Sequence, residues 1–223
     1  HYGFSDEGGL CRGLGTADMK SGCAAMIEAF MSASEHGTLP DNVMLALVVG
    51  EEETGDGTQA LLKSHSFKTA LVAEPTGMLP CTEHYGYVEM AVRTFGYRRH
   101  AAMSDRETNA IHAMLRFLIE LEDQVESLDA KTVLNIRDLH SSESGFAVPD
   151  RCAAAVDLHI PPGVSSRVFA EELRAFTDEK LAASRASKYE LEFPLLADGF
   201  ITSPDAALPR KLKNIFQTLG MEW

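Results

Sequence analysis

The chain has 223 residues, of which 45% are hydrophobic and 24% are charged, a composition ordinary for a globular protein with its own core. The formal net charge of −13 excludes nucleic acid as an expected partner, because no basic stripe is available to neutralise phosphates. No apolar run is long enough for a membrane span, no signal peptide is visible, and the four scattered cysteines are typical of reduced thiols in a cytoplasmic protein.

The first 17 residues are rich in glycine and show no period, and a helical pattern follows them. From residue 19 to residue 36 apolar side chains, among them Ile27 and Phe30, recur on one face of a predicted helix. Asp18 stands at the start of this helix. It is either an N-cap, a role that Thr16 would fill equally well, or a carboxylate available for binding.

Three consecutive carboxylates follow the next predicted element. The continuous apolar run over residues 43–49 is typical of a strand buried on both faces of a parallel sheet, and it leads into Glu51, Glu52 and Glu53. One interpretation is a solvated acidic turn closed by Gly55 and Gly57. The other is a ligand site, because open α/β sheets bind ligands at the carboxyl ends of their strands.

A further carboxylate, Glu74, occupies a similar position after a second apolar run at residues 69–73. A helix is predicted between the two runs, from about residue 57 to 65, and this strand, helix, strand order is typical of an α/β layered domain. Together with Asp18, these residues form a set of carboxylates that we expect to converge. Such sets bind hard or borderline divalent cations, with histidine added when the metal is zinc.

From about residue 86 the pattern changes to that of an antiparallel sheet with one wet face, beginning with Val88, Met90 and Val92. Further strands are predicted at about 132–138, 152–160 and 189–194, and helices at about 107–127 and 165–184. The order βαββαβ predicts a ferredoxin-like unit.

The end of the chain is predicted to return to the first part. Residues 195–204 are expected to be a linker, and a helix is expected over 205–219. We therefore expect three segments: 1–85, the first part of an α/β domain; 86–194, the inserted βαββαβ domain; and 195–223, the return.

Four motifs in this order, GTADMKSG, GEEETGDG, AEPTG and RRHAAMSDRETNAI, resemble those of the M20 family of zinc-dependent metallopeptidases. The resemblance is strongest to acetylornithine deacetylase, succinyl-diaminopimelate desuccinylase and carboxypeptidase G2. It implies a zinc-exopeptidase-like α/β catalytic domain, here partial, with an inserted ferredoxin-like α+β lid that also forms a homodimer. It further implies hydrolysis of an amide bond in a small N-acyl amino acid or peptide substrate that bears a free carboxylate.

The resemblance also implies roles for five residues. Asp18 matches a carboxylate that bridges two zinc ions, and Glu53 and Glu74 match further metal ligands, for which cobalt or manganese are also suitable. Glu52 matches the general base. His100 matches a lid histidine that holds the substrate carbonyl, often across a dimer, whereas without the resemblance it is an ordinary surface residue.

The sequence departs from the family pattern at several positions. An HxD motif and a C-terminal metal histidine are absent, so the chain matches the middle of an M20 protein without either end of the catalytic domain. Leu14, Ala147 and His159 stand where arginine, asparagine and arginine are usual, which predicts altered substrate recognition. The alternative function is therefore that of a truncated or degenerate, non-catalytic homologue that retains the fold and dimerises through the lid.

Overall fold

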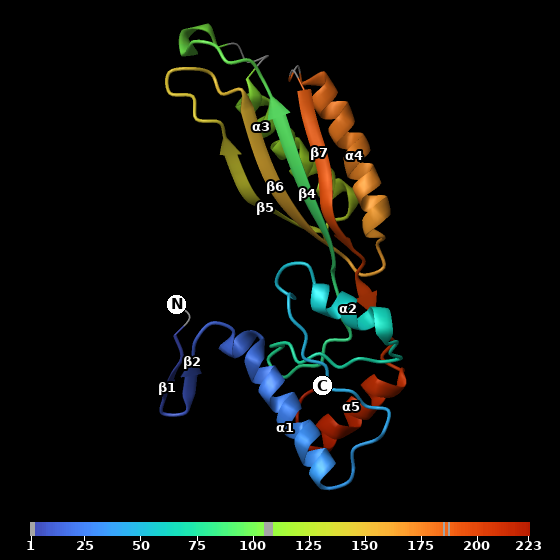
Figure 1. Ribbon diagram of the computed structural model, residues 1–223. Helices are drawn as coiled ribbons and strands as arrows, with labels where there is room; N and C mark the ends of the chain where they lie inside the picture. Colours follow the sequence, from blue (N-terminus) through green and yellow to red (C-terminus); the bar gives the residue numbers. More distant parts are fainter. Residues whose placement is uncertain (1–2, 105–108, 185, 187) are drawn as a thin grey trace. The chain divides into compact units, whose positions relative to one another are not determined.

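The computed structural model describes residues 3–104, 109–184, 186 and 188–223 (Figure 1). The chain divides into two compact units. Unit 1 comprises His1–Pro80 and Arg210–Trp223, and unit 2 comprises Cys81–Pro209. Each unit is described by itself below.

Unit 2 is a four-stranded antiparallel sheet with two helices on one face (Figure 1). The sheet has the order β5-β6-β4-β7, so the predicted βαββαβ arrangement is confirmed. The elements are β4 (Gly86–Phe95), α3 (Ala110–Leu128), β5 (Val133–Ser141), β6 (Arg151–Ile160), α4 (Ser166–Ala183) and β7 (Lys188–Ala197). The predicted start of α3, near residue 107, lies outside the described residues.

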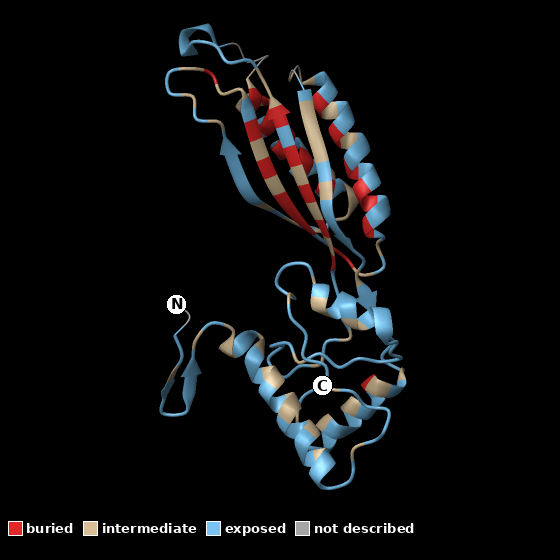
Figure 2. Ribbon diagram, viewed as in Figure 1, coloured by how far each residue is buried: buried red, intermediate tan, exposed pale blue. Residues whose placement is uncertain are grey.

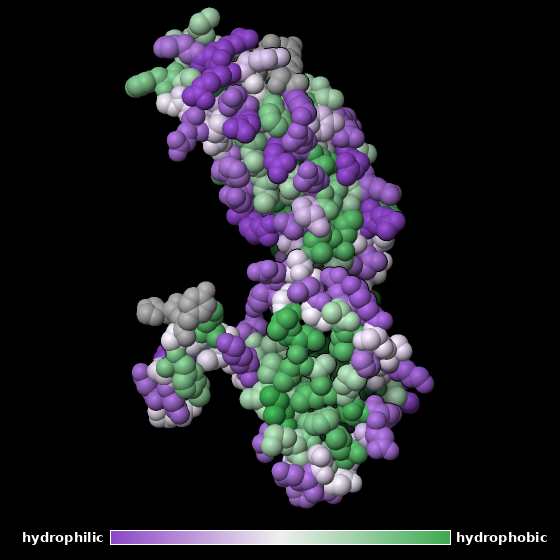
Figure 3. Space-filling model, viewed as in Figure 1, coloured by the Kyte–Doolittle hydropathy of each residue, from purple (hydrophilic) through white to green (hydrophobic). Residues whose placement is uncertain are grey.

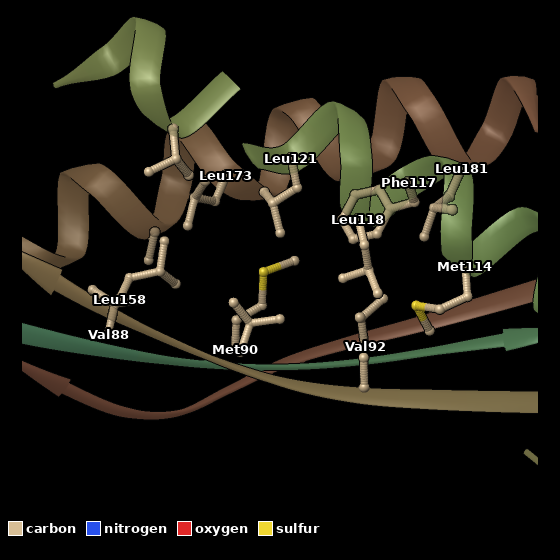
Figure 4. Packing of buried hydrophobic residues seen from close by; sticks show 14 of the residues in the cluster. Val88, Met90, Val92, Met114, Phe117, Leu118, Leu121, Leu158, Leu173 and Leu181 are labelled. Atoms are coloured by element: carbon tan, nitrogen blue, oxygen red, sulfur yellow. The ribbon is translucent and has the colours of Figure 1, made fainter. Parts of the chain in front are cut away.

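The core of unit 2 lies between the sheet and its helices. Alternate residues of β4, Val88, Met90 and Val92, are fully buried against apolar side chains such as Met114 and Leu121 of α3 (Figures 2 and 4). Burial of each such side chain stabilises the fold by about 1.5–3 kcal/mol. This core explains why the alternation seen in the sequence corresponds to a real strand.

The opposite face of the sheet carries a polar network. The Tyr87 hydroxyl donates to the Asp157 carboxylate at 2.7 Å, and Arg137 forms ion pairs with Asp157 and Glu89. Partial burial and the hydrogen bond to Asp157 raise the pKa of Tyr87 to about 12. This network gives buried Asp157 the partners that a charge needs in a sheet.

Unit 1 contains the predicted helices but few other regular elements. Helix α1 spans Ser21–Glu35, α2 spans Asp56–Ser64 and α5 spans Ala207–Thr218, close to the predicted ranges. A short hairpin, β1 (Ser5–Glu7) and β2 (Leu10–Arg12), was not predicted. Its turn is formed by Gly8 and Gly9, which both have positive φ, as the tight turn of a hairpin requires.

The two strands predicted in unit 1 are not formed. Residues 43–49 and 69–73 have no strand partner among the described residues, and Leu47, Val49 and Val72 are 57%, 73% and 65% exposed. No described residue within 3–80 or 210–223 is buried (Figure 2), and apolar side chains gather on the surface of this unit (Figure 3). A buried strand needs hydrogen-bonded neighbours and covering layers, and the described part of unit 1 supplies neither.

The predicted linker at 195–204 is partly strand. β7 continues to Ala197, and β8 (Phe200–Ile201) pairs with β3 (Glu83–His84). These pairings join segments far apart in sequence, so no local sequence pattern predicts them.

Candidate functional site

Asp18 and Glu74 are brought together at the start of α1. Asp18 lies in the short segment Thr16–Lys20 that leads into α1, where its own backbone is not helical (φ −113°, ψ 103°). Its side chain approaches that of Glu74 closely enough for the two carboxyl groups to share a proton in a hydrogen bond. The approach depends on Gly22, because a Cβ placed there would lie 2.0 Å from the carbonyl oxygen of Ala73. The glycine therefore allows α1 to contact the backbone immediately before Glu74.

Glu74 lies in a concentrated negative field. Its pKa is raised by partial burial first, then by the hydrogen bond with Asp18, and then by the charges of Asp18, Glu51 and Glu52. Three carboxylates thus act on Glu74 in this region. A bound proton or a cation relieves this repulsion.

The acidic turn is shaped by its glycines. The Gly55 amide donates to the Gly50 carbonyl at 2.7 Å, and the Gly57 amide donates to the Val49 carbonyl at 3.2 Å. A Cβ at Gly57 would lie 2.5 Å from that same Val49 carbonyl oxygen, so α2 begins in direct contact with the residues before the turn. The contact between Gly57 and Val49 closes the turn and holds the three consecutive glutamates in a compact loop.

The predicted metal ligands are only partly assembled. Asp18 and Glu74 are in contact, whereas Glu53 is placed only as a member of the acidic turn, where its amide donates to the Gly50 carbonyl at 3.3 Å. Within the described ranges, no group of three or more His, Cys, Asp or Glu residues is arranged to hold a metal ion. Two carboxylates this close can both supply oxygen ligands to one divalent cation, so the Asp18–Glu74 pair is suited to form part of a metal site.

Glu51 is a residue that the sequence analysis left without a role. Its charge acts on Glu74 together with that of Glu52. In the sequence, only its position next to Glu52, the predicted base, indicated a role for Glu51. A run of three glutamates does not show which of them lies near a carboxylate that is distant in the sequence.

His100 belongs to unit 2 and begins a short helical turn, Ala101–Met103. Its Nδ1 atom accepts a hydrogen bond from the Ala102 amide at 3.2 Å. In the neutral ring this contact assigns the proton to Nε2, which is then a hydrogen-bond donor. The ring is exposed.

His100 lies opposite Ala147, the position where asparagine was expected. The two residues form an antiparallel pair, held by the Val148 amide bonded to the Arg99 carbonyl at 2.7 Å and the Ala101 amide bonded to the Phe146 carbonyl at 2.8 Å. We call residues 97–103 and 142–148 the tip of unit 2. His159, another of the three substituted positions, lies near the C-terminal end of β6, where its ring makes an edge contact with the Tyr87 ring at a centroid distance of 5.4 Å.

Two further expectations concern the chain as a whole. Among the described residues no two cysteines form a disulfide; Cys152 is buried, whereas Cys11 and Cys81 are exposed. In the described ranges no helix combines the length and apolar character needed to cross a bilayer.

Comparison with known proteins relates the chain to a family of hydrolases. A protein of Pyrobaculum aerophilum with the provisional name LysW-lysine/LysW-ornithine hydrolase is 31% identical over 173 residues, which cover 75% of this chain and 49% of the relative. Succinyl-diaminopimelate desuccinylase of Roseobacter denitrificans is 24% identical over 99% of this chain and 62% of its own length. The chain thus spans about half to three fifths of these relatives.

A solved structure has a similar fold. The crystal structure of a tripeptidase from Staphylococcus aureus matches 95% of this chain and 58% of its own, with a TM-score of 0.69 and 16% sequence identity. The sequence model of peptidase family M20/M25/M40 matches residues 2–222. The chain therefore belongs to the peptidase family M20/M25/M40, as its four motifs had predicted.

Proposed function

We propose that the protein hydrolyses an amide bond in an N-acyl amino acid or short peptide with a free carboxylate, in a metal-dependent reaction. The observation that carries this proposal is the contact between Asp18 and Glu74 in the field of Glu51 and Glu52. Like charges held together at this density are costly unless a cation offsets them.

Asp18, Glu74 and Glu53 are the residues that would hold the metal, with zinc, cobalt or manganese all suited to carboxylate ligands. A divalent metal bound there would polarise the substrate carbonyl and lower the pKa of water. The three motifs of unit 1 contain no histidine, so further ligands from outside these motifs are part of the proposal.

The other two residues act on the substrate. Glu52 accepts a proton as the oxygen of water adds to the carbonyl carbon, and it delivers that proton to the nitrogen as the carbon–nitrogen bond breaks. His100, whose Nδ1 is occupied by the Ala102 amide, donates from Nε2 to the carbonyl oxygen as negative charge develops there. This step requires the tip of unit 2 to meet an acidic site of the same chain or of a second copy.

The domain roles follow from the same proposal. Residues 1–85 and 195–223 belong to the catalytic domain, and residues 86–194 form the lid through which two chains associate as a homodimer. β5 is an edge strand of the lid, and Val133 and Leu139 on it are 55% and 43% exposed, which suits pairing with a second copy.

A second candidate function is that of a non-catalytic homologue that retains the fold and dimerises through the lid. It is favoured by the incomplete ligand set among the described residues and by the lack of buried residues in the described part of unit 1. The two candidates differ in whether this chain binds metal.

Metal binding to the purified chain tests the proposal. Isothermal titration with zinc, with the metal content checked by elemental analysis, should show a site that Glu74→Gln weakens at least 10-fold. Glu28→Gln, an exposed change in the middle of α1, should leave the zinc affinity unchanged. Equal affinity in wild type and Glu74→Gln would refute the assigned site, and absence of binding in wild type would favour the non-catalytic candidate.

A further inference from the structure

We infer that Arg98 is a specificity-determining residue that binds the free carboxylate of the substrate beside His100. The inference rests on the proposed function, because it takes the ligand of the tip to be the substrate of that reaction. It adds to that function the residue that distinguishes an acid from its neutral amide.

The backbone around Arg98 departs from the regular ladder. β4 and β6 pair Phe95 with Arg151, and the next pair along the tip is His100 with Ala147. Four residues lie between Phe95 and His100, whereas only three lie between Ala147 and Arg151. The extra residue lies within 96–99, a bulge-like irregularity beyond the end of β4; an extra residue of this kind bends the chain and can re-aim a side chain.

The redirected Arg98 side chain reaches the turn that also carries Ala147. Its Nη1 donates to the Glu143 carbonyl at 3.4 Å, and the turn itself is closed by the Ala147 amide bonded to the Ser144 carbonyl at 2.9 Å. His100 and Arg98 therefore both contact the segment 143–147, one through the backbone pair and one through its guanidinium.

The contacts of Arg98 leave it able to bind an anion. A guanidinium has five N–H donors in a planar fork that matches a carboxylate, and the Glu143 carbonyl is a neutral acceptor at long distance. The neighbouring Asp150 carboxylate accepts a 2.7 Å hydrogen bond from the Ser142 hydroxyl, which is the main cause of its lowered pKa, and the positive charge of Arg98 adds a smaller effect. The exposed guanidinium is thus a charged donor close to a turn whose last residue, Ala147, has no polar side chain.

The chemistry of an N-acyl amino acid fits this pair of donors. Its carboxylate carbon is three covalent bonds from the carbon of the scissile carbonyl, so both groups are within reach of adjacent side chains. His100 supplies an N–H donor for the carbonyl oxygen, and Arg98 supplies the cation for the carboxylate. A substrate without the carboxylate loses only the interaction with Arg98 and keeps the one with His100.

The test compares an acid with its amide in three variants of the full chain. Hydrolysis of N-acetylalanine and N-acetylalaninamide is measured with zinc for wild type, Arg98→Gln, Arg98→Lys and the control Arg116→Gln, an exposed change on α3. We expect Arg98→Gln to lower kcat/KM for the acid by about 10- to 100-fold, mainly through KM, since a charged hydrogen bond is lost. The amide should be unaffected, Arg98→Lys should retain part of the preference, and Arg116→Gln all of it.

Binding to the metal-free chain separates this inference from the proposed function. N-acetylalanine is titrated while the backbone amide NMR signals of residues 98–101 are followed, and circular dichroism checks that each variant is folded. If wild type hydrolyses neither compound the proposed function fails, and the titration alone then decides the role of Arg98. A Kd raised at least 10-fold in Arg98→Gln supports the inference; an equal Kd, no binding in wild type, or an unchanged acid-to-amide ratio overturns it.

Discussion

Replacement of Gly22 by alanine should separate the two carboxylates on which the candidate metal site depends. The added Cβ would lie 2.0 Å from the Ala73 carbonyl oxygen and 2.8 Å from the Ala73 Cβ. Because Cβ contacts below 3.0 Å are essentially not observed, the start of α1 must move away from Ala73 by about 1 Å. Asp18 lies four residues before Gly22 and moves with it.

Two effects on stability oppose each other in this variant. Alanine is favoured over glycine inside a helix by about 0.8–1 kcal/mol, whereas the enforced backbone shift costs about 1–3 kcal/mol. We therefore expect a small loss of stability and a large loss of function. Zinc affinity should fall at least 10-fold, since a displacement of about 1 Å breaks the geometry that ligands require.

The assay is isothermal titration with zinc on wild type, Gly22→Ala and Gly3→Ala. Gly3 is the matched control, because a Cβ there meets nothing within 4 Å. If Gly22→Ala binds zinc as tightly as wild type, the close approach of α1 to Ala73 does not position Asp18. The structural reasoning for the site would then be refuted.

Two changes in unit 2 test the caps of its helices. Asn109→Ala should destabilise unit 2 by about 1 kcal/mol, because the Asn109 side chain accepts hydrogen bonds from the Ile111 and His112 amides at the start of α3. Urea unfolding followed by circular dichroism measures this loss of stability. An unchanged midpoint of unfolding would contradict the prediction. Hydrogen bonds from the Ser166 hydroxyl and amide lower the pKa of Asp198 in the folded protein. The ionised Asp198 therefore stabilises the fold fully above the pKa of an unfolded aspartate, and this stabilisation is lost as the pH falls through the lower pKa of the folded state. The stability difference between wild type and Asp198→Asn should accordingly vanish on acidification from pH 7, and a difference that persists after Asp198 is protonated would disprove this assignment.

Unit 2 could be predicted from the sequence because its elements have local signatures. Val88, Met90 and Val92 alternate with polar residues, and each lies in the core as that pattern requires. The bulge at 96–99 and the pairing of His100 with Ala147 could not be predicted, since they depend on a register set between segments 47 positions apart.

The candidate site could be predicted only through the family motifs. Nothing local to Asp18 distinguishes a helix cap from a partner of Glu74, and the contact between them depends on the Gly22 approach to Ala73. The apolar runs at 43–49 and 69–73 have the composition of buried strands, but a strand also requires neighbours, and a sequence pattern does not supply them.

The difference in packing between the two units predicts which backbone amides metal binding should protect from exchange. Unit 2 has a packed core, whereas the described part of unit 1 has no buried residue, so amides of α1 should exchange with solvent much faster than those of β4 or α3. Zinc that binds Asp18 and Glu74 links α1 to the segment after residue 73 and stabilises that arrangement by about 2.7 kcal/mol at a concentration 100 times its Kd. Hydrogen exchange followed by mass spectrometry should therefore show α1 slowed by up to about 100-fold with zinc in wild type and not in Glu74→Gln, with β4 unchanged in both. Protection that zinc confers equally on both units, or that survives in Glu74→Gln, would mean that the ion binds elsewhere.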